Sequence, residues 1–381
     1  MTLFRISVYS LKMTSTFENE LAWVRAHMPR LRRVLDDLPD LAGVRLACSV
    51  HLEIKMVPLF EGLLSRCAKL FLTTCNPATV RDEVAVLLRE RGAEVEASFA
   101  MSPSQYDLAV QQALDWRPTH LIEMGADLTT ALHQRGDAKS QVRAGLEGTG
   151  SGVSRLADLT LRYPVFNYDD LPIKEGLHNR FMVGLTTWQA FFDRTRLTLH
   201  GRQVLVIGYG SVGRGVADSA RAFGGTVMIA ERDPARAMEA AYAGWRVLPL
   251  EEAIAEADVI VTATGAGRII RAEHLPLLRD GAFLLNVGHR ADEIDVDALR
   301  ANPHEEVLPF IEAIRIGGRT IHLFAGGSMA NLTAGKGDSL NSFDLTVALL
   351  AAGAGHLVKN GERQSPGLHL LPRQVWEPYL T

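Results

Sequence analysis

The stretch VLVIGYGSVGRGVADSARAFGGTVMIAERDP, residues 204–234, decides the fold predicted for this chain. Its first four residues are apolar and predict a buried strand, and Gly208, Gly210 and Gly213 follow in the spacing G-x-G-x-x-G. The first glycine permits a tight turn, the second lets a pyrophosphate approach the backbone, and the third lets the next helix pack closely on the strand. Because the amino end of that helix also favours an anion, the stretch predicts a Rossmann domain that binds a dinucleotide. A Rossmann-like domain with an empty site is the alternative.

An acidic residue narrows the choice of dinucleotide. The segment TVMIA (226–230) predicts the second strand, and Glu231 directly follows it. A carboxylate at this position accepts a hydrogen bond from a ribose 2′-hydroxyl and repels a 2′-phosphate, so the sequence favours NAD over NADP. The neighbouring Arg232 argues the other way, because an arginine there can accommodate a 2′-phosphate. The cofactor-binding residues predicted in this stretch are Gly208, Gly210, Ser211, Val212, Gly213, Glu231 and Arg232.

Two more strand patterns follow, at 257–265 and 281–289. Polar residues and glycines lie at their carboxyl ends, which is where doubly wound sheets bind ligands. We expect these residues to complete the cofactor site. They are Thr264, Gly265, Asn286, Gly288 and His289.

The first half of the chain alternates strand and helix patterns in the same way. Short strands separated by helices predict a parallel sheet that is covered by helices on both faces. We therefore predict an α/β fold with two doubly wound parallel-sheet domains, the second of which is the Rossmann domain. An amphipathic helix is predicted over 17–36, and a helix that joins the two halves over 181–195. The strands of the first half are predicted at 44–50, 69–76, 93–100 and 119–125, and the helices between them at 57–68, 79–92 and 106–116.

The composition is that of a globular protein and argues against several classes of function. The chain has 381 residues, 47% of them hydrophobic, and a net charge of −4 with Lys and Arg spread along its length. Such a distribution argues against a nucleic-acid surface and against a basic membrane patch. No apolar run approaches the roughly 18 residues of a membrane span. Cys48, Cys67 and Cys75 are irregularly spaced, so they predict neither a disulfide framework nor a metal site, and a reducing cytoplasm is the expected location.

Several blocks of sequence carry a resemblance to a known family. GYGSVGRG, ERDPARA, VTATG, NVGHRADEIDVDAL and LFAGGSMANLTAGKG are similar to blocks of S-adenosyl-L-homocysteine hydrolase, or adenosylhomocysteinase. The resemblance extends upstream, in the same order, through SVHLEIK, TCNPATVRDEVAVLL, GAEVEA and PVFNYDDLPIKEGLHNR. It implies a substrate-binding domain over 13–184, completed by 338–381, and an inserted NAD-binding domain over 185–337. It also implies a homo-oligomer, a dimer or tetramer, that acts on a small-molecule substrate.

The chemistry that the resemblance implies explains why a hydrolase carries a Rossmann domain. NAD oxidises a ribose 3′-hydroxyl to a ketone, and the neighbouring C4′ proton becomes acidic enough for a base to remove. A thiolate then leaves, water adds to the resulting enone, and the hydride returns. The net redox change is zero, so NAD is a recycled catalyst and not a co-substrate.

The resemblance also implies roles for individual residues. Lys174 and Asn179 match residues beside the reacting carbinol, where a lysine can take the hydroxyl proton. His51 matches a histidine near the leaving group, and His289 matches one that touches the ribose. The residues implied to contact the nicotinamide are Asn331, Thr149 and Ser151.

The predicted substrate pocket departs from the family pattern. His178 stands where the family has an Asp, and a histidine there is a candidate general acid or base. Asp338 stands in place of a histidine at the substrate mouth, and Gly148 in place of the glutamate that holds the ribose hydroxyls. The other departures are Met124 for a carboxylate, Glu53 for a Thr, and Lys55 for a Gln or Glu at the adenine edge.

Three classes of function remain open on the sequence. The first, which we predict, is an NAD-dependent, redox-neutral hydrolase or lyase that acts on S-adenosylhomocysteine or an analogue. The second is a net dehydrogenase that releases NADH. The resemblance implies a longer C-terminal tail that carries a Lys and a Tyr into the NAD site of a neighbouring subunit, and this sequence shows no counterpart after LPRQVWEPYLT. Without that tail we expect faster exchange of NAD, which a net dehydrogenase requires. The third is an NAD-binding pseudoenzyme. Lys174, Asn179 and His51 argue against the third class, because binding alone needs no acid–base set.

Overall fold

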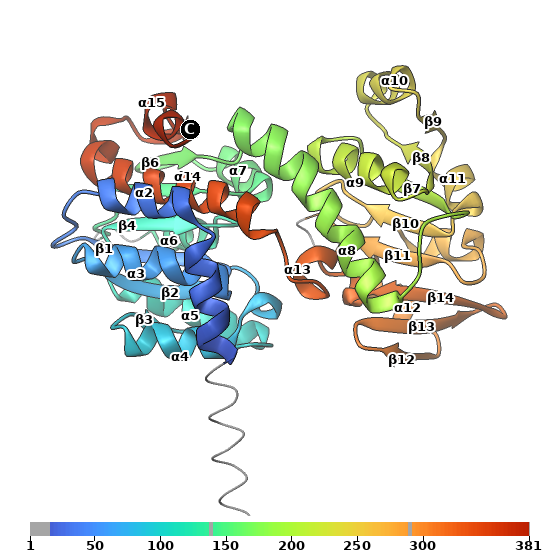
Figure 1. Ribbon diagram of the computed structural model, residues 1–381, viewed down its shortest axis with the longest axis horizontal. Coiled ribbons are helices and arrows are strands. Elements are labelled where there is room, and N and C mark those ends of the chain that lie inside the picture. The colour runs from blue at the N-terminus through green and yellow to red at the C-terminus, as the bar shows by residue number, and fades with distance from the viewer. Residues whose placement is uncertain (1–15, 137–139, 289–291, 381) are drawn as a thin grey trace, which may run out of the picture. The chain divides into compact units, whose positions relative to one another are not determined.

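A computed structural model describes residues 16–136, 140–288 and 292–380 (Figure 1). The chain divides into two compact units, and each is described by itself. Unit 1 consists of Met1–Leu171 and Leu340–Thr381, and unit 2 consists of Pro172–Ser339. The first division comes before the expected limit at 184/185, so the helix that was expected to join the two halves falls within unit 2.

Unit 1 is built on a parallel sheet with the strand order β15-β6-β5-β4-β1-β2-β3. Most residues of its strands are buried, because helices cover both faces of the sheet. The order reverses between β1 and β4, which makes the carboxyl ends of these strands the switch point of the sheet. The strands are β1 (Arg45–Val50), β2 (Lys69–Thr74), β3 (Glu94–Val95), β4 (His120–Glu123), β5 (Ala144–Glu147), β6 (Pro164–Asn167) and β15 (Gly367–Leu370).

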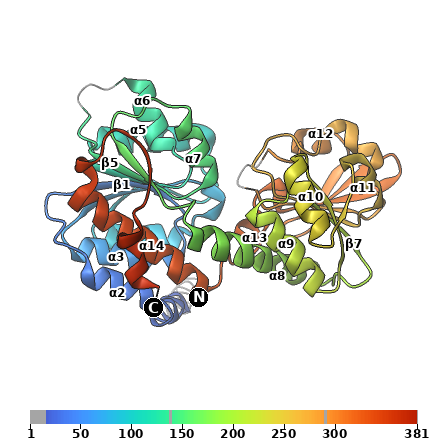
Figure 2. The same cartoon turned by 90° about the horizontal axis from the view of Figure 1, so that it is seen from above.

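The α/β prediction for this half is confirmed, with one strand much shorter than expected. Strands lie within 44–50, 69–76 and 119–125, whereas the segment 93–100 forms only the two residues of β3. Figure 2 shows α2, α3 and α14 on one side of the sheet and α5, α6 and α7 on the other. The helices are α2 (Pro29–Asp37), α3 (Val57–Ser65), α4 (Asp82–Glu90), α5 (Pro103–Asp115), α6 (Asp127–Arg135), α7 (Gly150–Ala157), α14 (Leu340–Asn360) and α15 (Arg373–Trp376).

The single helix predicted over 17–36 is wrong, because two helices occupy this segment. The backbone is helical at 16–26, and α2 begins anew at Pro29. Proline has no amide proton and its ring clashes with the preceding turn, so it is tolerated in the first turn of a helix but not in the interior. The apolar spacing continues across this break, which is why periodicity alone suggested one helix.

Unit 2 is built on a second sheet, with the order β12-β13-β14-β11-β10-β7-β8-β9. The strands from β14 to β9 pair in parallel, which is the doubly wound arrangement predicted for the Rossmann domain. The order reverses between β7 and β10, so the switch point is at the carboxyl end of β7, where the glycine loop begins. The strands are β7 (Gln203–Ile207), β8 (Thr226–Ala230), β9 (Arg246–Val247), β10 (Val259–Thr262), β11 (Phe283–Asn286), β12 (His304–Leu308), β13 (Ile311–Ile316) and β14 (Arg319–Phe324).

Helices cover both faces of this sheet as well. Trp188 and Phe191 of α8 pack with Val206 on one face, while Ile254 of α11 packs with Leu205 on the other. The antiparallel pairing of β12, β13 and β14 was not predicted; β12 is exposed along its whole length and therefore carries no apolar face that a pattern could reveal. The helical segments are η3 (Lys174–Met182), α8 (Val183–Thr195), α9 (Ser211–Ala222), α10 (Pro234–Tyr242), α11 (Leu250–Glu256), η4 (Ala272–Leu277), α12 (Val296–Arg300) and α13 (Ala330–Thr333).

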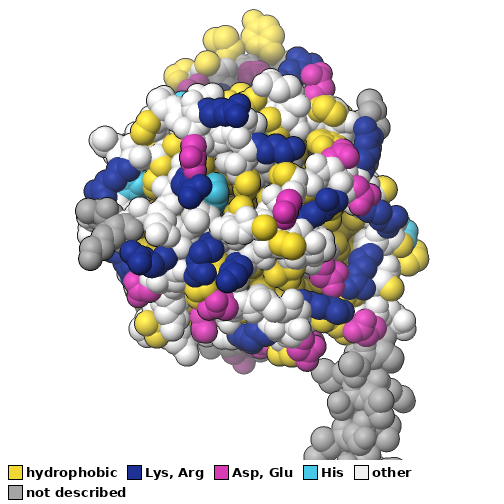
Figure 3. Space-filling model, turned by 90° about the vertical axis from the view of Figure 1, so that its left-hand side faces the viewer, with side chains coloured by type: hydrophobic (Ala, Val, Ile, Leu, Met, Phe, Trp, Pro, Cys, Tyr) yellow, Lys and Arg dark blue, Asp and Glu magenta, His cyan; other side chains and the backbone are white. Residues whose placement is uncertain are grey.

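The surface of unit 1 carries charges of both signs. Figure 3 shows Lys and Arg side chains interspersed with Asp and Glu on the face that it presents. Within unit 1, Arg25 pairs with Glu61 at 2.7 Å and Arg81 with Glu20 at 2.9 Å. In the described parts of the chain, every helix is too short or too polar to cross a membrane.

Candidate functional site

The glycine loop after β7 is formed by close backbone approaches. Gly208 has φ +97°, and a Cβ on it would lie 2.8 Å from the carbonyl oxygen of Ala263. A Cβ on Gly213 would lie 2.0 Å from the carbonyl oxygen of Gly208, so only glycine lets α9 begin against the loop. The side of Gly210 is open, since a Cβ there would meet nothing nearer than Nη1 of Arg236, at 3.9 Å. This opening leaves a phosphate room to approach the backbone beside the amino end of α9.

The carboxylate of Glu231 is fixed at the edge of this loop. Its Oε2 atom accepts a hydrogen bond from the backbone amide of Tyr209 at 2.6 Å, and its Oε1 atom accepts one from the amide of Asp233 at 2.9 Å. Arg232 is exposed and lies beside it in the chain. The held carboxylate is therefore placed where a ribose hydroxyl of a dinucleotide would donate to it.

A second carboxylate, which sequence reasoning missed, supports the loop after β10. Glu293 is fully buried and accepts hydrogen bonds from the amide of Thr264 at 3.0 Å, from its hydroxyl at 2.8 Å, and from the amide of Gly265 at 2.6 Å. A Cβ on Gly288 would lie 1.6 Å from Oε1 of Glu293, so the glycine makes room for this side chain. Burial raises the pKa of Glu293, and the hydrogen bonds from Thr264 oppose that rise. Glu293 thus acts on the site through the loop that it holds.

Two buried asparagines follow the later strands of unit 2. The Asn286 amide donates to the carbonyl of Gly327 at 3.0 Å, and its oxygen accepts from Thr262 and from the amide of Gly288. Asn331 is 2% exposed, and within the described residues its buried Oδ1 atom has no hydrogen-bond partner. An orphaned buried acceptor costs about 1–3 kcal/mol, so a ligand that donates a hydrogen bond there would relieve a real penalty.

The arrangement fits NAD. The open face at Gly210 suits the pyrophosphate, Glu231 suits the adenosine ribose, and the orphaned oxygen of Asn331 suits the carboxamide of the nicotinamide ring. Ser211 and Val212 open α9 beside the loop. Ser211 donates from its hydroxyl to Glu175 at 2.7 Å, which ties η3 to the same loop.

The segment η3 is a π-helix of nine residues, Lys174–Met182. Helices of this kind are rare and occur frequently at functional sites. It packs against α9 without intervening side chains, because a Cβ on Gly215 would lie 1.4 Å from the carbonyl oxygen of Arg180. Lys174 is 6% exposed and lies on this element with Asn179. Unit 2 therefore presents a buried amine on an element fastened to the helix of the glycine loop.

His178 and Asp338 form a buried pair at the two ends of unit 2. Nε2 of His178 lies 2.7 Å from Oδ2 of Asp338, and Nδ1 lies 3.0 Å from Oδ1 of Asn179. The two side chains of the pair are 11% and 7% exposed. Two sequence departures that were noted separately thus prove to be partners.

In unit 1, His51 follows the carboxyl end of β1 at the switch point of the sheet. Its Nδ1 atom lies 2.8 Å from the hydroxyl of Thr79 and 3.6 Å from the sulfur of Cys75. Burial, and then the nearby carboxylates of Asp127 and Glu147, raise the pKa of Cys75 well above its usual value. A raised pKa favours the thiol over the nucleophilic thiolate.

Lys55 is buried beside the same strand end. Its Nζ atom lies 3.1 Å from Oε2 of Glu53 and 4.7 Å from the centre of the Phe343 ring. The lysine is 5% exposed, so the carboxylate and the ring face take the place of much of the water around its amine. The pair offers a ligand one group that only donates and one that only accepts.

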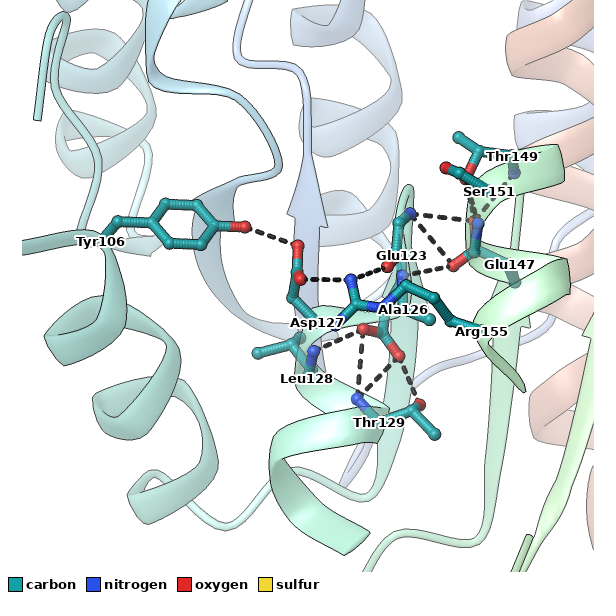
Figure 4. A network of polar contacts seen from close by, with 12 residues as sticks. Tyr106, Glu123, Ala126, Asp127, Leu128, Thr129, Glu147, Thr149, Ser151 and Arg155 are labelled. Carbon is teal, nitrogen blue, oxygen red and sulfur yellow. Dashed lines mark hydrogen bonds and ion pairs between the residues drawn. The ribbon is translucent and has the colours of Figure 1, made fainter. Parts of the chain in front are cut away.

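A network of buried carboxylates lies at the carboxyl ends of β4 and β5 (Figure 4). Glu147 accepts hydrogen bonds from the amides of Gly125 and Ala126 and from the amide and hydroxyl of Thr149. A Cβ on Gly152 would lie 2.3 Å from its carboxyl carbon, so α7 can begin here only with glycine. Burial raises the pKa of Glu147, and these hydrogen bonds act against the rise. We assign Glu147 to holding the turns before α6 and α7.

Glu123 and Asp127 extend the network. Glu123 accepts hydrogen bonds from the amides of Leu128 and Thr129 in the first turn of α6, where a carboxylate is favoured by the helix dipole. Asp127 accepts from the hydroxyl of Tyr106 at 2.5 Å and from the guanidinium of Arg155 at 2.6 Å. Figure 4 shows these side chains converging from α5, α6 and α7. Sequence reasoning missed this cluster, although two acidic strand ends before glycine-rich turns are a signal for it.

Gly148 has a tyrosine in the space that a side chain would fill. A Cβ on Gly148 would lie 2.2 Å from the hydroxyl oxygen and 2.4 Å from Cζ of Tyr168. Tyr168 is fully buried, so it cannot turn away into solvent. With Tyr168 in this position, a side chain at 148 would clash with its ring.

The remaining predicted residues that the structure describes lie in unit 1. Met124 is buried after β4, and Thr149 and Ser151 open α7, all within unit 1. The hydroxyl of Thr149 is engaged with Glu147 and with the amide of Gly152. His289 lies outside the described residues. Among the residues that are described, no group of three or more His, Cys, Asp or Glu could hold a metal ion.

Comparison with known proteins gives matches along most of the chain. Residues 6–162 match the family described as S-adenosyl-L-homocysteine hydrolase, and residues 189–337 match the NAD binding domain of that family. A protein of Pyrococcus abyssi named adenosylhomocysteinase is 35% identical over 372 residues, which cover 94% of this chain and 87% of that protein. A protein of Methanopyrus kandleri named S-inosyl-L-homocysteine hydrolase is 34% identical over 367 residues, covering 93% of this chain and 87% of that protein. A Thermotoga maritima adenosylhomocysteinase is 34% identical, covering 95% and 93% respectively.

Proposed function

The chain belongs to the S-adenosyl-L-homocysteine hydrolase family, and from that premise we propose that it hydrolyses a nucleosidyl thioether of homocysteine. NAD is the cofactor. The chemistry that NAD supplies when bound is the reversible removal of a hydride from a secondary alcohol of the substrate. Because the hydride is returned within each turnover, the net reaction is a hydrolysis.

The observation that carries the proposal is the placement of an acid–base set beside the glycine loop in unit 2. Lys174 lies on η3, and η3 packs on α9 through Gly215 and bonds to Ser211 through Glu175. An amine in this position takes the proton of the substrate hydroxyl as its carbon is oxidised, and returns it when the hydride comes back. Asn179 orients the same hydroxyl. Binding of a dinucleotide alone needs none of these side chains.

Unit 1 carries further candidates for contacts with the substrate. His51 is the candidate for the leaving-group end, because it follows β1 at the switch point where doubly wound sheets bind ligands. Lys55 and Glu53 are the candidates for the edge of the purine base. Thr149, Ser151 and Met124 remain candidates for contacts with the bound molecules.

The base of the substrate is adenine or hypoxanthine. The two differ at position 6, where adenine carries an amino donor and hypoxanthine carries an oxygen acceptor. Lys55 can serve only the acceptor and Glu53 only the donor. A comparison of the two thioethers therefore reports which member of the pair meets the base.

The test is thiol release from S-adenosylhomocysteine and from S-inosylhomocysteine by the purified full chain with NAD, followed with a thiol-reactive dye. We expect homocysteine from at least one thioether and no build-up of NADH over many turnovers. NADH that accumulates in step with product would contradict the redox-neutral cycle and indicate a net dehydrogenase. No thiol from either compound would contradict the proposed substrate class.

Two coarser features are proposed on the same basis. A homo-oligomer, either a dimer or a tetramer, is the assembly we propose, and sedimentation velocity of the full chain tests it. A cytoplasmic location is proposed because the cysteines described in the structure, Cys48, Cys67 and Cys75, are free thiols. Fractionation of cells that produce the tagged chain tests that location.

A further inference from the structure

The pair of His178 and Asp338 has a geometry suited to carrying a proton. His178 lies four residues after Lys174 on η3, about one helical turn away, and both side chains are buried. Asp338 reaches the ring from the other end of unit 2, 160 residues later in the chain. A group one turn from the amine that serves the carbinol is placed to serve the next carbon of the same substrate.

The contacts of the imidazole ring show how it is oriented. Nε2 faces a carboxylate oxygen of Asp338 at 2.7 Å, and Nδ1 faces the amide oxygen of Asn179 at 3.0 Å. A neutral imidazole has one donor and one acceptor nitrogen, whereas the protonated ring has two donors. Oxygen atoms at both nitrogens therefore match the ring in the state that it reaches after taking up a proton.

We propose that His178 is the catalytic base of the reaction and that Asp338 is its positioning residue. This inference rests on the proposed function. Asp338 keeps a proton on Nε2 and stabilises the positive ring, as the buried carboxylate does in a Ser-His-Asp triad. Nδ1 is the atom that exchanges a proton with the substrate, and Asn179 receives the Nδ1–H bond once the proton has been taken.

The proton that His178 takes up during elimination is returned when water adds, in agreement with the redox-neutral cycle. When the substrate alcohol is at the ketone level, Nδ1 takes the proton from the adjacent carbon. The electron pair of that C–H bond forms a carbon–carbon double bond, and the C–S bond breaks with its pair on sulfur, so that a thiolate leaves. The oxygen of a water molecule then bonds to the carbon that lost sulfur, and Nδ1–H returns its proton to the other carbon of the double bond. The proton that the water gives up goes to the thiolate, which leaves as the thiol.

A structural role is the competing explanation. His178 follows the first residue of unit 2 closely and Asp338 precedes its last, so the pair also ties the two ends of the unit together. Loss of such a tie would impair every step of the reaction in parallel. Loss of a base would impair only the steps that move the carbon-bound proton.

The experiment uses the full chain with NAD and the thioether that the wild type cleaves. It compares the wild type with His178→Ala and Asp338→Asn. The control variant is His304→Ala, which removes an exposed histidine of β12. Three quantities are followed: NADH formed in a single turnover, thiol released, and deuterium taken up from heavy water by the carbon next to the carbinol. In His178→Ala we expect thiol release and deuterium uptake to fall by about 10²–10⁴-fold, while NADH formation stays within about tenfold. Added imidazole is expected to restore thiol release at least in part.

Asp338→Asn supplies a second readout, because the amide keeps the shape of the carboxylate but cannot stabilise the protonated ring. We expect kcat for thiol release to fall and KM to change little, with NADH formation retained. A rise in KM together with the fall in kcat, and reduced thermal stability, would indicate a tie between the ends of unit 2.

The possible outcomes separate the inference from its premise. If the wild type releases thiol and His178→Ala does so within tenfold of it, His178 is not the base, while the proposed function stands. If NADH formation, thiol release and deuterium uptake all fall together and imidazole restores none of them, the pair is structural. If the wild type releases no thiol from either thioether, the proposed function fails and this inference fails with it.

Discussion

Gly148 shows how one residue position can be determined by a neighbour that is distant in the sequence. The ring of Tyr168 occupies the space that any side chain at 148 would need. A small residue and a large one thus fit together at the carboxyl end of β5. Neither Gly148 nor Tyr168 reveals this fit from its place in the sequence alone.

A double-mutant cycle tests this fit at the residue scale. Gly148→Ala places a Cβ against the Tyr168 ring, and we expect it to lower the free energy of unfolding by about 1–3 kcal/mol, as overpacking does. Tyr168→Leu removes the atoms that clash, so we expect the double variant to be more stable than the sum of the single changes by about 1–2 kcal/mol. Urea unfolding of the four proteins measures the coupling. Additive effects would show that the two side chains do not compete for one space.

At the scale of elements, the contact between η3 and α9 fixes where the acid–base residues lie in unit 2. Gly215 of α9 admits the backbone carbonyl of Arg180 of η3, and Gly184 in the first turn of α8 admits the carbonyl of Gly215. Such a contact tolerates no added atom, in contrast to one made by flexible side chains.

Gly215→Ala and Gly176→Ala form a matched pair for this contact. A Cβ at 215 would overlap the carbonyl of Arg180, whereas a Cβ at 176, on η3 itself, would meet nothing within 4 Å. We expect Gly215→Ala to lower thiol release at least tenfold and to destabilise the chain, because η3 must move. Gly176→Ala is expected to keep both, with a small gain from helix propensity. Equal behaviour of the two variants in activity and thermal melting would contradict the role of the contact.

The strand β4 gives a prediction for pH. Burial, and secondly the charge of Arg143, lower the pKa of His120 in this strand to about 4. An unfolded histidine takes up a proton near pH 6.5, so between about pH 6.5 and pH 4 the unfolded chain binds more protons than the folded one. His120 therefore opposes folding increasingly as the pH falls through this window.

The variant His120→Gln isolates that contribution. Between pH 7 and pH 5 we expect the wild type to lose about 2 kcal/mol more of its unfolding free energy than the variant does. Urea unfolding of both proteins at the two pH values measures the difference, and other titrating groups cancel between them. Parallel losses in the two proteins would show that His120 does not titrate in this way.

At the scale of the whole molecule, bound NAD links the residues of unit 2 to the stability of the chain. A ligand that binds only the folded state stabilises it by about 2.7 kcal/mol at a hundred times its dissociation constant. We expect NAD to raise the melting temperature of the wild type more than NADP does at the same concentration, because Glu231 repels a 2′-phosphate. In Glu231→Ala the two shifts are expected to converge. A wild type that responds equally to both would contradict the assignment of Glu231.

Much of the fold and part of the site could be predicted from the sequence, because the responsible signals are local. The strand VLVI and the spacing of Gly208, Gly210 and Gly213 lie within ten residues, so one turn determines them. Strand–helix alternation likewise predicted both parallel sheets. The break before Pro29 and the exposed strand β12 were missed because apolar periodicity persists across the first and is absent from the second.

By itself, the sequence determined the glycine loop, the acidic residue after the second strand and the alternation that folds both units, since each depends on residues that are neighbours in the chain. Only the tertiary structure decided which departures belong together. It joined His178 to Asp338 across 160 positions, set Tyr168 into the place left by Gly148, and committed Glu147 to the backbone amides before α6 and α7. The physical reason is that packing and hydrogen bonding depend on distance in space, which a parallel sheet sets through crossovers that no local pattern encodes.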